Sequence, residues 1–93
     1  MNANQNIHDI LKEAIELLKD TKNLTMQHDV IYHQTYDGDQ IIRVASFKEV
    51  QCGGAFPGVL VEEQFPTSFD VVIFDPELLN AYDEAKKALS TTK

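Results

Sequence analysis

The spacing of apolar residues changes twice along this chain, and these changes restrict the folds it can adopt. Between Ile7 and Leu18 apolar residues recur every three or four positions, which is the period of a helix with one buried face. From Leu24 to Phe74 they fall at alternate positions or in short runs, as in strands. The helical spacing then returns at Leu78, Tyr82, Ala85 and Leu89. The pattern predicts an α+β fold with a helix at each end and a sheet between them.

The residues that flank the two helical patterns are typical of helix ends. Asn6 is a suitable cap for a helix over about residues 6–20, and Asp75 for one over about residues 76–89. Pro76 takes the first helical position, where a backbone N–H is not needed. The residues expected to be buried in the core are Leu11, Leu18, Val72, Phe74, Tyr82 and Leu89.

Four strands are expected between the helices, joined as two hairpins in a mainly antiparallel sheet. The first hairpin covers about residues 24–47, with Asp37-Gly38 as its turn. That turn would set Tyr32 opposite Arg43 and leave apolar residues on both faces, unless a bulge shifts the register. The second strand pair covers about residues 59–74. Because residues 71–74 are all apolar, the last strand is predicted to be central and covered on both faces.

Three of the four glycines lie between residues 49 and 58, which predicts a glycine-rich loop there. Cys52 precedes two of them, and a cysteine nucleophile needs a neighbouring base such as His33. A small apolar role for the cysteine is the simpler interpretation, because single cysteines and scattered histidines occur by chance. The alternative is a ligand-binding or enzymatic domain with its site at the Cys52–Gly58 loop, formed by Cys52, Gly53, Gly54 and His33.

No metal or cofactor site is predicted. His28 and His33 would point to opposite faces of one strand, so they would not chelate a metal together. The turn at Asp37–Asp39 lacks the ligand spacing of a calcium loop. The glycines at 53, 54 and 58 lack the Lys-Ser/Thr pair of a phosphate-binding loop. The sequence therefore favours a chain that is not an enzyme.

The charge is strongly acidic and unevenly distributed. The 93 residues include 15 acids and 8 bases, for a net charge of −7 at pH 7. This balance disfavours direct binding to nucleic acid or to an anionic membrane. No Lys or Arg occurs between Lys48 and Lys86, whereas eight acids do. A long acidic stretch either keeps the protein soluble or forms a face for a basic partner.

Glu62, Glu63 and Asp70 are the acids predicted to bind a protein partner with a basic surface. Phe56, within the glycine-rich segment, would be either an apolar plug between that loop and the core or an exposed aromatic anchor for the partner. The simpler interpretation of Glu62 and Glu63 is that they are solvated charges or protect a sheet edge, since adjacent strand residues point to opposite faces. The function favoured by the sequence is a small non-catalytic interaction module, such as an inhibitor or adaptor of a basic or nucleic-acid-binding protein.

Little in the sequence points to a compartment other than the cytoplasm. Cys52 is the only cysteine, so an internal disulfide is excluded. The first six residues lack the basic and apolar regions of a secretory signal. No apolar run approaches the roughly 20 residues that span a bilayer. We expect one cytoplasmic domain, and the sequence is compatible with a homo-oligomer.

Overall fold

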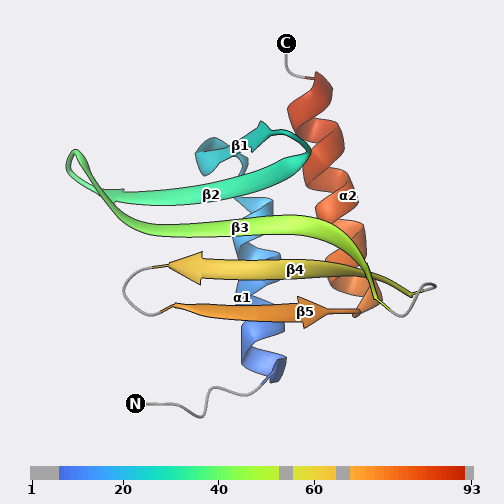
Figure 1. Ribbon diagram of the computed structural model, residues 1–93. Helices are drawn as coiled ribbons and strands as arrows, with labels where there is room; N and C mark the ends of the chain where they lie inside the picture. The colour runs from blue at the N-terminus through green and yellow to red at the C-terminus, as the bar shows by residue number, and fades with distance from the viewer. Residues whose placement is uncertain (1–6, 53–55, 65–67, 92–93) are drawn as a thin grey trace.

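The computed structural model describes residues 7–52, 56–64 and 68–91, and it consists of a sheet with two helices on one side (Figure 1). The helices are α1 (Ile7–Lys19) and α2 (Pro76–Thr91). The strands are β1 (Leu24–Gln27), β2 (Val30–Asp37), β3 (Gln40–Cys52), β4 (Phe56–Gln64) and β5 (Phe69–Ile73), and a 3₁₀ turn, η1 (Thr21–Asn23), joins α1 to β1. The predicted α+β class is confirmed, with one strand more than expected.

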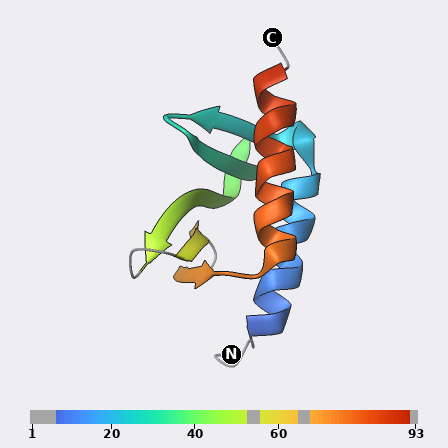
Figure 2. The ribbon, with the colours of Figure 1, turned by 90° about the vertical axis from the view of Figure 1, so that its right-hand side faces the viewer.

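The five strands form an antiparallel meander in which each strand lies beside its neighbour in sequence. Among the described residues both helices cover the same face of this sheet, and the opposite face carries no helix (Figure 2). Neither described helix combines the length and the apolar character needed to cross a bilayer.

The core fills the space between the helices and the sheet. Phe47, Val59 and Val61 from the middle strands are fully or almost fully buried there, as are Leu18 and Tyr82 from the helices. The predicted burial of Leu18 and Tyr82 is confirmed, and the predicted core residues Leu11 and Leu89 are half-buried against the same cluster.

The prediction that residues 71–74 form a central strand is wrong. β5 is an edge strand that pairs with β4 in the described part of the chain. Val71 packs against the core on the helix side, whereas Val72 is half-buried and Phe74 is 47% exposed. The continuous apolar run arises because the face without helices also carries apolar side chains, so the run does not identify a strand covered on both sides.

The fifth strand results from a turn that the sequence pattern does not predict. His28 and Asp29 form a two-residue loop between Gln27 and Val30, and both loop residues have positive φ, at 54° and 64°. Such turns favour Asn-Gly, because most side chains are strained in this region. The hydroxyl of Tyr82 donates a hydrogen bond of 3.1 Å to the carbonyl oxygen of Asp29. That bond attaches the turn to α2.

The β2–β3 hairpin differs from the predicted register. Its two loop residues are Gly38 and Asp39, because Asp37 pairs with Gln40. An irregularity between Thr35 and Tyr36 shifts the pairing again. The sequence leaves open whether a bulge shifts the register; it does, and Tyr32 lies opposite Ser46 rather than Arg43.

Most of the segment expected to be a glycine-rich loop is strand. β3 runs to Cys52 and β4 starts at Phe56, so the connection between them is confined to residues 53–55, which lie outside the described residues. Gly58 is part of β4, where a Cβ atom would lie 2.8 Å from Cε1 of Phe74. Glycine is needed at position 58 because the ring of Phe74 occupies the space that a side chain would take. An aromatic ring packed over a glycine in this way is known to stabilise the glycine in a sheet.

Candidate functional site

The sheet face opposite the helices, which we term the open face, is not covered by either described helix. Alternation along the strands assigns side chains to it, since their neighbours in sequence face the core. Its members on the four longer strands are Val30, Tyr32, Gln34, Val44, Ser46, Lys48, Val50, Leu60, Glu62, Gln64, Asp70 and Val72.

Two acids occupy directly opposite positions on the open face. Glu62 of β4 pairs in register with Asp70 of β5, and both residues are exposed. Ser46 of β3 continues the same row and donates a hydrogen bond of 3.4 Å to Oε1 of Glu62. No ion pair among the described residues involves either acid. Like charges directly opposite each other in a sheet are destabilising, and Lys48 on the same face lies diagonally across from Glu62.

An apolar patch adjoins the acid pair. Leu60 and Val72 are cross-strand partners one row away from Glu62 and Asp70, and both are half-buried. Val50 lies opposite Gly58 in the following row, and the Phe74 ring lies against that glycine. The apolar patch, defined as Val50, Leu60, Val72 and Phe74, thus continues from the acids to the end of β5. The sequence predicted both acids, but it assigned Val72 and Phe74 to the core.

Glu63 lies on the other face of the sheet from this surface. Its side chain is buried on the helix side, at 7% exposure, and Nε of Arg43 donates a hydrogen bond of 3.0 Å to it. Nη2 of Arg43 also contacts the carboxylates of Glu63 and of Glu13 in α1. Burial raises the pKa of Glu63, and the adjacent Arg43 opposes part of that rise. The structure therefore does not bring Glu63 together with Glu62 and Asp70.

His33 belongs to a second polar cluster, at the carboxyl end of α1. Its ring is 1% exposed, and Nε2 lies 3.4 Å from Oδ2 of Asp20. Asn23 donates a hydrogen bond of 2.9 Å to the same oxygen. The hydrogen bond from Asn23, with a smaller effect from His33, lowers the pKa of Asp20. Nδ1 of His33 is buried and has no hydrogen-bond partner among the described residues.

The residues of the alternative ligand site are not all close together. His33 lies opposite Ala45 in β3, and Cys52 follows seven residues further along that strand. Seven strand residues span about 23 Å, which is too far for a histidine to act on a cysteine thiol. The side chains of Cys52 and Phe56, and all of Gly53 and Gly54, lie outside the described residues. Among the residues that are described, no three metal-ligating side chains form a cluster.

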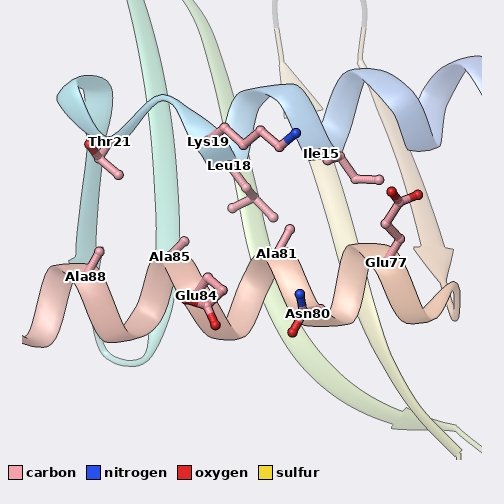
Figure 3. A pocket seen from close by; sticks show the side chains of 10 residues that line it. All are labelled: Ile15, Leu18, Lys19, Thr21, Glu77, Asn80, Ala81, Glu84, Ala85 and Ala88. Atoms are coloured by element: carbon pink, nitrogen blue, oxygen red, sulfur yellow. The ribbon is translucent and has the colours of Figure 1, made fainter.

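A groove of about 490 Å³ separates α1 from α2 on the side away from the sheet (Figure 3). Leu18 and Ala85 are among the buried residues of its apolar floor. Its rim carries Lys19 on α1 and Glu77 and Glu84 on α2, so charges of both signs border it. The open face likewise carries one base, Lys48, beside its two acids, so the signs of the charges do not distinguish the groove from the open face.

Comparisons of this chain with protein-family models, with curated proteins and with solved structures find no match. The functional argument therefore depends on the geometry of the open face and on its charge.

The acid pair and the apolar patch of the open face could be located in the sequence from the register of the β4–β5 hairpin. Glu62 and Asp70 are equidistant from residue 66, so a hairpin centred there pairs them. With that register, Leu60 also pairs with Val72. Apolar alternation alone does not supply the register, because residues 71–74 are apolar at every position.

Proposed function

We propose that this chain is a non-catalytic protein-binding module whose open face binds a basic segment of a partner protein. One observation carries the proposal: Glu62 and Asp70 are exposed, directly opposite each other and beside the apolar patch. A chain selected only for stability would gain by replacing one of these acids, since their repulsion opposes pairing of β4 with β5.

A Lys or Arg placed between the two carboxylates would remove that repulsion and form charge-assisted hydrogen bonds. The apolar patch beside them would supply contact area that excludes water, which charged contacts alone do not provide. The net charge of −7 would attract the same partner from a distance and speed its association. An inhibitor or adaptor of a basic protein is the class of function that fits these features.

The test uses a photo-crosslinking amino acid at Val72 on the open face, with Asn80 on the exposed side of α2 as the control position. Irradiation in the source lysate should capture one basic protein from position 72 and not from position 80. That partner is then purified, and its association rate with the native chain is measured at low and high salt.

Charge reversal provides the matched variants. Glu62→Lys with Asp70→Lys should slow association at low salt by about tenfold or more, because steering and the local ion pairs are both lost. Asp83→Lys with Glu84→Lys makes the same change in net charge on α2, and should have a smaller effect. If the two double variants associate equally slowly, only net charge matters, and a specific role for the open face is excluded.

A further inference from the structure

The outer edge of β5 has no strand beside it in the described part of the chain. A sheet edge of this kind exposes backbone N–H and C=O groups that can pair with another strand. Proline and lysine often protect such edges, but the five residues Phe69–Ile73 contain neither. The opposite edge strand, β1, has four residues and contacts α2, so β5 is the more accessible edge.

The helix beneath the sheet extends past this edge. In two perpendicular views the first turn of α1, drawn in dark blue, lies beyond β5, and none of the described strands lies over it (Figures 1 and 2). Ile7 begins this turn and shares the helical face of Leu11 and Leu18, which pack on or in the core. Ile7 is nevertheless 64% exposed. An additional strand about 4.8 Å from β5 would lie over this overhanging turn and cover its apolar face.

The rows of the open face indicate which residues such a strand would carry. The row Ser46, Glu62, Asp70 ends at the β5 edge in a carboxylate, so Lys or Arg is favoured at the next position. On the helix side the added strand would meet Val71 and the overhanging turn of α1, where apolar residues are favoured. The complementary segment therefore alternates basic and apolar residues.

A second copy of this chain is a poorer occupant. Pairing two β5 edges would bring two Asp70 side chains and their neighbouring Glu62 residues close together without a cation from either β5. Each copy also carries a net charge of −7. Charge complementarity thus favours a basic segment of another protein.

We propose that β5 accepts an extended segment of a partner protein, with alternating basic and apolar residues, as a sixth strand. This inference takes its preference for a basic partner from the proposed function and adds the mode of binding, which is strand addition rather than contact with the open face alone.

The test uses the full chain and a blocked nine-residue peptide in which lysine alternates with valine. The control peptide has the same sequence but is N-methylated at two adjacent central residues, which removes one hydrogen-bond donor from each edge of the peptide. NMR titration should show binding of the first peptide and slower hydrogen exchange of β5 amides. The methylated peptide should bind about tenfold more weakly, since its charges and side chains are unchanged but the edge that pairs with β5 loses one backbone donor and carries a methyl group in its place.

Substitutions at two neighbouring residues test whether the peptide contacts the first turn of α1. Ile7→Ser should weaken binding of the unmethylated peptide by about fivefold, because apolar contact with the first turn of α1 is lost. His8→Ser changes an exposed residue in the same turn and should leave the affinity unchanged. If both peptides bind equally well and β5 amides gain no protection, strand addition is excluded while binding of basic segments to the open face stands. If neither peptide binds at millimolar concentration, the sixth strand is also excluded, and the crosslinking experiment decides the proposed function separately.

Discussion

Tyr82 joins two parts of the fold that are far apart in sequence, and its hydroxyl group can be tested by itself. Tyr82→Phe keeps the buried ring but removes the hydrogen bond to the carbonyl oxygen of Asp29. The free energy of unfolding should fall by about 1 kcal/mol, as is usual for one hydrogen bond. Tyr36→Phe is the control, because the hydroxyl of Tyr36 donates to Gln34 in an exposed setting. Urea melts of both variants measure the difference, and equal midpoints would contradict it.

The same phenol makes stability depend on alkaline pH. Burial, with a contribution from the negative charge of Glu49, raises the pKa of Tyr82 above its ordinary value of 10.0. The unfolded chain therefore loses this proton at a lower pH than the folded chain, and stability falls as the pH rises from 10.0 toward the folded pKa. This fall should be smaller in Tyr82→Phe than in the native chain. Thermal melts from pH 9 to pH 11 measure it.

Gly58 and Phe74 should be energetically coupled. A Cβ atom at position 58 would lie 2.8 Å from the Phe74 ring and 3.3 Å from the carbonyl oxygen of Ile73, so Gly58→Ala should cost about 1 kcal/mol. In a Phe74→Ala background the ring is absent, and the same substitution should be close to neutral. A double-mutant cycle in urea tests this, and additive effects would mean that the ring does not restrict position 58.

The turn between β1 and β2 is the element with the least favourable local sequence. Replacing His28 and Asp29 with Asn-Gly should raise the free energy of unfolding by about 1 kcal/mol, because this pair tolerates the positive φ at both positions. The bond from Tyr82 should persist, since its acceptor is a backbone carbonyl. Asp29→Ala should act in the opposite direction. A stability unchanged by either substitution would show that the positive-φ conformation carries little strain.

Elements with a strong local pattern could be predicted from the sequence, and elements set by contacts at a distance could not. Both helices can be predicted because their signals, the apolar period and the cap at Asp75, depend only on residues close together in the sequence. The structure contains the expected cap: the backbone N–H of Glu77 donates a hydrogen bond of 2.8 Å to the carboxylate of Asp75. The sequence does not predict the turn at His28 and Asp29, because this turn contains no glycine. Half of the site could be predicted: charge identifies Glu62 and Asp70, and strand alternation places Glu62 and Glu63 on opposite faces. The sequence does not show that Glu63 is the one on the core side with Arg43.

At the scale of the whole molecule, Arg43 connects the sheet to α1 through Glu63 and Glu13. Arg43→Met would leave Glu63 buried without its cation, and should lower the free energy of unfolding at pH 7 by about 3 kcal/mol. The pKa of Glu63 should then rise further, so the loss should shrink as the pH falls and the carboxyl group takes up a proton. Adding Glu63→Gln to Arg43→Met should recover most of the stability. Chemical melts at pH 5 and pH 7 measure both effects, and a loss that is the same at both pH values would exclude this cause.

The order of the elements along the chain has a consequence for biosynthesis. The meander lets each strand pair with the one made just before it, so the sheet can grow as the polypeptide leaves the ribosome. Leu78, Tyr82 and Ala85, which complete the core, are in α2, which is synthesised after all five strands. A nascent chain that ends before Pro76 therefore has a sheet whose apolar helix side is covered by α1 alone. Until translation of α2 is complete, this half-covered surface is available to chaperones and to other nascent chains.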